Sequence, residues 1–200
     1  MKTFFSNVWV KCISSLLILA VVLGGMLAVL NPLLHVPAEE RTARAIKKIY
    51  GEAKEFTVYL DVDDSTRTDK AIDCFDQSQT AIGTINKIYQ IENDTLFQTT
   101  GYNGYKNGTI TLWIKVSKTQ GERLIIDKIV LETNTKQTLM SKLDGSYYQK
   151  FYVDVTDNLE FFSSKTDYNG EHKNVVSGAT KSAMAGCNAV NCVLYYLGVK

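Results

Sequence analysis

The feature that most constrains this chain is an uncharged apolar run near its N-terminus, from Ile13 to Leu30. An α-helix rises about 1.5 Å per residue, so about 20 residues cross a hydrocarbon layer roughly 30 Å thick. The run is longer than the apolar core of a cleaved signal peptide, about 7–15 residues, and no A-x-A cleavage site follows it. We therefore expect residues 1–37 to form a short tip and a single uncleaved membrane anchor, with a cleaved signal peptide as the alternative.

The charges on either side of this run bear on its orientation. Lys2 and Lys11 precede the run without any acidic residue, which favours a cytoplasmic N-terminus and an extracytoplasmic main domain under the positive-inside rule. Basic residues beyond the run favour the opposite orientation: Arg41, Arg44, Lys47 and Lys48. Because these begin well past the apolar run and adjoin two glutamates, we predict a single-pass cell-membrane protein with its N-terminus in the cytoplasm.

The rest of the chain has the composition of one compact domain. Its formal net charge of +1, from 22 basic and 21 acidic residues, provides no electrostatic drive toward nucleic acid. We divide it into a juxtamembrane helix and first strand region, residues 38–79, and a main domain, residues 80–200. The four cysteines contain no CxxC pair, so we expect free, mostly buried thiols and no structural metal site.

Local patterns predict an α+β fold after the anchor. Good helix formers from Ala38 onward, with Gly51 as a stop, indicate a short helix. Four runs of alternating or β-branched residues predict a half-buried antiparallel sheet: Phe56 to Val62, Thr80 to Ile91, Thr109 to Val116 and Arg123 to Glu132. Apolar residues spaced by three and four predict an amphipathic C-terminal helix packed on that sheet: Ala183, Cys187, Val190, Leu194 and Leu197.

Two polar features carry no predicted chemistry. His35 and His172 have no serine or cysteine arranged around them as a nucleophile, so we predict no catalytic residue. The acidic stretch from Asp61 to Asp64 lacks the glycine and glutamate spacing of a calcium loop, so we interpret it as a solvated loop rather than a metal site.

A short motif, Ser177-Gly178-Ala179-Thr180, stands immediately before the C-terminal helix. A helix N-terminus carries unpaired N–H groups and about half a positive charge, so a phosphate-bearing ligand fits there. The alternative is that a Ser or Thr at this point only caps the helix. The residues alone leave both interpretations open.

The same motif resembles the flavin attachment site of the FMN-binding domain family, whose members include flavin-carrying components of the Rnf electron-transport complex and of the sodium-translocating NADH:quinone reductase. The resemblance implies that Thr180 receives FMN through a phosphoester bond, with Ser177, Gly178 and Ala179 around it. Family members usually carry Asp three residues before the serine, where this chain has Asn174.

Two further patches are similar to the same family. Gly101 to Tyr105, leading into the Thr109 to Val116 strand, resembles its glycine and tyrosine turn, and Val130 to Thr133 resembles a strand that ends in Glu-Thr near the flavin ring. The resemblance implies that Glu132 and Thr133 contact the flavin. The alternatives are an ordinary hairpin turn and a solvated strand end.

The resemblance implies a function as well as a cofactor. The chain is expected to be a membrane-anchored flavoprotein, an electron-transfer component that relays electrons within an Rnf-like ion-translocating oxidoreductase. Its expected partners are the other subunits of that membrane complex and a flavin transferase for maturation. The alternatives are a membrane-anchored binding or structural domain without a redox cofactor, and a stand-alone extracellular electron-transfer flavoprotein.

Overall fold

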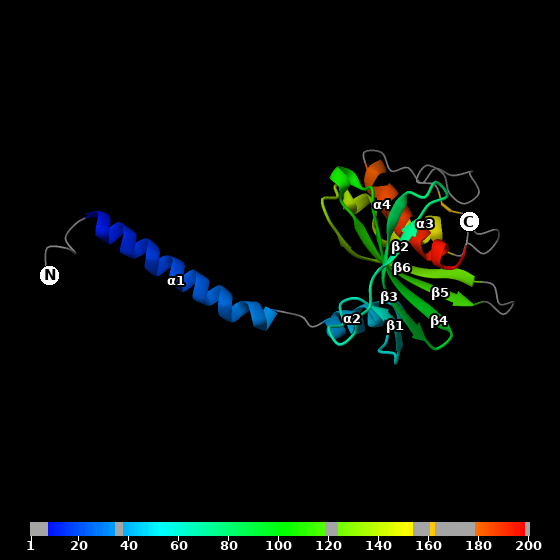
Figure 1. The fold of residues 1–200 in the computed structure, drawn as a ribbon, viewed down its shortest axis with the longest axis horizontal. Helices are drawn as coiled ribbons and strands as arrows, with labels where there is room; N and C mark the ends of the chain where they lie inside the picture. The colour runs from blue at the N-terminus through cyan, green and yellow to red at the C-terminus, as the bar shows by residue number, and fades with distance from the viewer. Residues whose placement is uncertain (1–7, 35–37, 119–123, 154–160, 163–178, 199–200) are drawn as a thin grey trace. The chain divides into compact units, whose positions relative to one another are not determined.

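The computed structural model has the predicted α+β architecture: an N-terminal apolar helix, an antiparallel sheet of six strands and a C-terminal helix (Figure 1). It describes residues 8–34, 38–118, 124–153, 161–162 and 179–198. The chain divides into two compact units, Met1–Arg41 and Thr42–Lys200. Each unit is described by itself.

The first unit contains helix α1, Val8–Leu34. Its segment Trp9–Leu30 spans 22 residues with a mean hydropathy of 2.6, and none of it is buried within the protein. A helix of this length and composition can cross a membrane, because about 20 apolar residues suffice. The predicted apolar span is therefore a continuous helix.

The second unit is built on one antiparallel sheet. Its strands are β1 (Thr57–Asp61), β2 (Ile72–Phe75), β3 (Ala81–Ile91), β4 (Asp94–Gly101), β5 (Ile110–Lys118) and β6 (Leu124–Asn134). The order across the sheet is β1-β3-β4-β5-β6, and β2 also pairs with β3. The four predicted strands are confirmed, whereas β2 and β4 were not predicted. Residues 42–79 thus belong to the same compact unit as the main domain.

The two faces of the sheet bury different side chains because strand residues alternate in direction. On β5, Leu112 and Ile114 belong to the main core, which includes the buried apolar residues of α4 (Thr180–Tyr196) and the buried tyrosines of α3 (Gly145–Tyr152). Trp113 points to the other face and packs with Ile46 and Ile49 of α2 (Ala38–Tyr50). Figure 1 shows α3 and α4 on one side of the sheet. The C-terminal helix was predicted, and its packing on the sheet is confirmed.

The three cysteines of the second unit are free and buried, as predicted. Cys74 lies on β2, and Cys187 and Cys192 lie on α4. Burial raises the pKa of the Cys187 thiol to about 12. Cys12 is exposed on α1.

A buried ion network joins β1 and β3 beneath α2. The ammonium of Lys87, 2% exposed, lies 3.1 Å from Asp61 and 3.0 Å from Asp63. The hydroxyl of Tyr89 donates to Asp61 and lies 3.3 Å from the Thr42 hydroxyl. Burial, then the bond to Asp61, raises the pKa of Tyr89 above its ordinary value. The prediction of a solvated acidic loop is therefore wrong for Asp61. Its burial was not predicted because its partner, Lys87, lies 26 residues further along the chain.

Replacing Lys87 by methionine is expected to destabilise the second unit by about 3 kcal/mol, because it leaves a buried carboxylate without its cation. Thermal unfolding of the full chain in detergent, followed by circular dichroism, measures the effect. The matched control is Lys54→Met, since the partners of Lys54, Glu52 and Glu92, are both 66% exposed. Equal melting temperatures for the two variants would contradict a stabilising role for the network.

Helix α3 begins with a side-chain cap. Asp144 precedes it in an extended conformation, and its Oδ1 accepts from Ser146 N at 3.0 Å and Tyr147 N at 3.2 Å. The hydrogen bond from the Ser146 hydroxyl, followed by those backbone bonds, holds the pKa of Asp144 below its usual value of 3.8. Sequence patterns did not decide the conformation of this segment.

Asp144→Ala is expected to lower the melting temperature by a few degrees at neutral pH, because the first turn of α3 loses its acceptor. A carboxylate with a lowered folded-state pKa stabilises the fold above its unfolded pKa and loses this effect as the pH falls through the folded pKa. The gap between wild type and variant should therefore close below pH 3.8. Melting curves at a series of pH values from 7 down to 2 test this, and a gap of constant size across that range would contradict it.

Candidate functional site

A surface cavity of about 270 Å³ lies at the N-terminal end of α4. It is lined by residues from three segments distant in the sequence: Tyr105, Thr138, Ala179, Thr180, Lys181 and Ser182. The structure therefore brings the glycine and tyrosine turn next to the Ala179 and Thr180 end of the predicted attachment motif. Ser177 and Gly178 lie outside the described residues, as does Asn174.

The start of α4 leaves Thr180 available for chemistry. Ala179, 2% exposed, occupies the capping position, and it makes no side-chain cap hydrogen bond. Thr180 is the first helical residue and is half-buried, so its hydroxyl is not the cap of this helix. Within the part of the chain that the structure describes, no side-chain acceptor caps this end of α4, and such a helix N-terminus can present N–H groups to a ligand.

Two loops hold the opposite wall of the cavity. The side chain of Gln137 accepts from Tyr105 N at 3.0 Å and donates to Thr135 O at 2.7 Å, so it ties the β4–β5 loop to the segment after β6. A Cβ at Gly104 would lie 2.6 Å from the backbone oxygen of Gly108 and 2.6 Å from the Gln137 amide nitrogen, and the backbone contact requires glycine there. Ser182 Oγ donates to Thr138 O at 3.5 Å, which brings α4 to the same segment.

The electrostatics of this cavity favour an anion. Lys181 is exposed in the first turn of α4, where the helix dipole is positive. The six lining residues that the structure describes include one basic side chain and no acidic one. A phosphate group therefore fits this end of α4 both by charge and by hydrogen bonding.

Glu132 and Thr133, the other predicted site residues, are not brought to this cavity. Gln98 donates to the Glu132 carboxylate at 2.5 Å, and Gln98 is the register partner of Trp113. Both therefore lie on the sheet face that carries Trp113, away from α4. Thr133 pairs with Thr111, whose hydroxyl is 2.9 Å from that of Thr100.

Sequence reasoning missed Thr138 and Lys181 as lining residues. Thr138 follows β6 by several residues, and it reaches the cavity through contacts that sequence patterns do not reveal: Gln137 bonds to the β4–β5 loop, and Thr138 O accepts from Ser182 of α4. Lys181 follows the motif directly, so its place in a predicted first helical turn was the available signal. His35 and His172 lie outside the described residues, and among those described no cluster of metal-binding side chains occurs.

No protein-family model, curated protein or solved structure matches this chain.

Proposed function

We propose that this chain is a membrane-anchored flavoprotein that carries FMN covalently on Thr180 and relays electrons within a membrane oxidoreductase complex. The observation that carries the proposal is the cavity at the start of α4. There a half-buried threonine hydroxyl, a helix N-terminus whose cap residue Ala179 makes no side-chain cap hydrogen bond, and Lys181 converge, within a motif similar to that of the FMN-binding domain family.

The cavity suits the phosphate end of FMN. At about 270 Å³ it is slightly smaller than a typical small-molecule pocket of about 300–1,000 Å³. It would hold the phosphate and the adjoining chain, with Thr180 Oγ bonded to phosphorus and Lys181 beside the remaining phosphate charge. Tyr105 and Thr138 would flank the chain on the opposite wall.

The protein's part in this function is attachment and position. When bound, the flavin supplies the one- and two-electron chemistry, so none of the chain's own acids, bases or nucleophiles is needed to react. A covalent bond would retain the cofactor in a domain outside the cell membrane, where a dissociated flavin is diluted. Glu132, bonded to Gln98 on the other sheet face, is not assigned a role toward the ring.

The anchor and the partners complete the proposal. Helix α1 would hold the second unit at the membrane, on the extracytoplasmic side. There a flavin transferase would transfer the FMN group from an activated flavin nucleotide to the Thr180 hydroxyl, and the donor's phosphoanhydride bond would break as the phosphoester forms. Other redox proteins of the complex would exchange electrons with the bound flavin. Lys2 and Lys11 before the apolar run, together with the family resemblance, support this placement.

In-gel flavin fluorescence tests the proposal. The full chain is produced together with a flavin transferase, denatured, separated on a gel and viewed under ultraviolet light. Fluorescence that survives denaturation is expected at the position of the chain. Its absence from a folded, transferase-exposed sample would contradict the covalent site and leave the cofactor-free binding domain as the better interpretation.

A further inference from the structure

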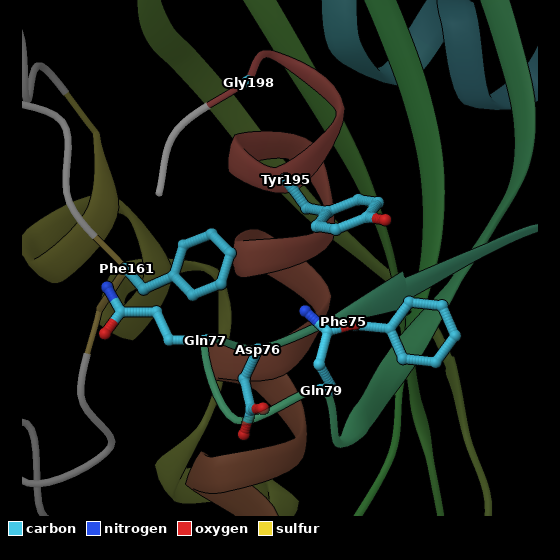
Figure 2. Close-up of a pocket in the computed structure, with 7 residues that line it drawn as sticks. All are labelled: Phe75, Asp76, Gln77, Gln79, Phe161, Tyr195 and Gly198. Atoms are coloured by element: carbon cyan, nitrogen blue, oxygen red, sulfur yellow. The ribbon is translucent and has the colours of Figure 1, made fainter.

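A second and larger cavity lies at the opposite end of α4 from Thr180. Its volume is about 560 Å³, which falls within the range of about 300–1,000 Å³ typical of small-molecule sites. Aromatic side chains, Phe75, Phe161 and Tyr195, form much of its lining. Figure 2 shows Tyr195 near the end of α4, Phe161 on a separate segment beside the helix, and Asp76, Gln77 and Gln79 on the turn that passes close to α4.

The aromatic walls favour a planar ligand. The rings of Phe75 and Tyr195 meet edge to face, with centroids 6.3 Å apart and planes at 65°. Tyr195 nevertheless remains 38% exposed, so part of its ring is open to a ligand. Aromatic faces bind other flat rings by stacking and attract cations through their negative quadrupole.

The hairpin supplies a preorganised polar wall. Asp76 Oδ1 accepts from Ser78 N and Thr80 N, both at 2.8 Å, which fixes the carboxylate; within the part of the chain that the structure describes, Oδ2 accepts no hydrogen bond. Gln79, with a φ of 60°, occupies the left-handed region that favours glycine or asparagine. Such strained residues occur often at ligand sites, and Gln79 lines this cavity.

The charge at this end of α4 is opposite to that at Thr180. A helix C-terminus carries about half a negative charge, and the described lining residues include the Asp76 carboxylate and no basic side chain. The cavity therefore disfavours a phosphate. Since α4 has 17 residues at about 1.5 Å each, roughly 20 Å separates Tyr195 from Thr180, too far for one bound flavin to reach both sites.

We propose that this cavity is a second ligand site, selective for a small planar heteroaromatic cation. The ligand's ring stacks on Tyr195, and its charged N–H group donates to Asp76 Oδ2. The carboxamides of Gln77 and Gln79 meet the remaining polar edge of the ring. The site is independent of flavin attachment at Thr180.

Binding of three fluorescent ring systems of different charge tests the proposal. The full chain in nanodiscs of zwitterionic lipid is titrated with proflavine, a planar cation, and empty nanodiscs serve as the blank. Neutral riboflavin and anionic FMN are measured as competitors of bound proflavine, so that flavin held at Thr180 does not count. Proflavine is expected to bind saturably and at least about tenfold more tightly than FMN, as an attraction of about 1.4 kcal/mol would give.

Single-residue variants test whether proflavine binds in this cavity. Tyr195→Ala is expected to weaken proflavine about tenfold. Asp76→Asn keeps the Oδ1 acceptor of the turn but removes the charge, so it should weaken proflavine and leave riboflavin unchanged. The matched control is Tyr196→Ala, because Tyr196 is exposed and packs on Phe97, and it is not among the lining residues.

Three results would overturn the proposal: no saturable binding of proflavine, equal affinity for FMN and proflavine, or equal losses in Tyr195→Ala and Tyr196→Ala. Thr180→Ala should leave proflavine binding intact. A failure of this site is therefore distinguishable from a failure of flavin attachment at Thr180.

Discussion

Thr180→Ala is expected to remove all flavin that survives denaturation, because the variant lacks the oxygen that forms the phosphoester. Its fold should be unchanged, since Thr180 is half-buried in the first turn of α4 and Ala179, not Thr180, occupies the capping position. In-gel fluorescence of wild type and variant, made with the same flavin transferase, measures the loss. Circular dichroism confirms that both are folded.

Two further substitutions of hydroxyl-bearing residues test whether the attachment is specific to Thr180. Thr180→Ser keeps an oxygen at the same place and is expected to retain covalent flavin. Ser182→Ala removes the neighbouring hydroxyl, which donates to Thr138 O at 3.5 Å, and should also retain it. Full fluorescence in Thr180→Ala, or loss of fluorescence only in Ser182→Ala, would show that the flavin is attached at another residue.

Gly101→Ala is expected to be the most damaging single substitution in the second unit, at about 4 kcal/mol or more. A Cβ at Gly101 would lie 1.9 Å from Ala185 O and 2.4 Å from Ala189 N, both backbone atoms of α4. Since backbone cannot move aside as a side chain does, α4 would have to leave the sheet. Chemical unfolding of the full chain in detergent measures the loss.

Gly145→Ala is the matched control for this substitution. Gly145 is the first residue of α3, and a Cβ there would have nothing within 4 Å. The variant should be as stable as wild type or slightly more, because alanine is the better helix former. A Gly101→Ala protein that unfolds at the same denaturant concentration as Gly145→Ala would show that α4 does not lie so closely on β4.

The fold was largely predictable because burial imposes periodicity on the elements that it stabilises. The apolar span, four strands and the C-terminal helix all follow from such patterns. Strand β4 (Asp94–Gly101) was not predicted because four consecutive residues, Leu96 to Thr99, are buried, so its sequence shows no alternation of apolar and polar residues. Strand β2 has only four residues, too few to show a period.

The candidate site was predictable only in part. The motif places Ala179 and Thr180 at a helix start, and the structure has α4 begin there. The opposite wall depends on Gln137, which holds Tyr105 from 32 residues away in the sequence, and no local pattern encodes such a contact. The bulge in the β5–β6 pairing beside Glu132 likewise depends on the partner strand. The face of the sheet on which the Glu132 side chain lies therefore could not be predicted from the sequence.

The most direct test of covalent flavin on Thr180 is mass spectrometry of the tryptic peptide Asn174–Lys181 from the transferase-modified chain. This peptide contains two hydroxyl side chains, Ser177 and Thr180. Covalent FMN on Thr180 requires the peptide to gain the mass of FMN less one water, with fragment ions that carry the increment on Thr180. An unmodified peptide, or an increment carried by Ser177, would contradict it.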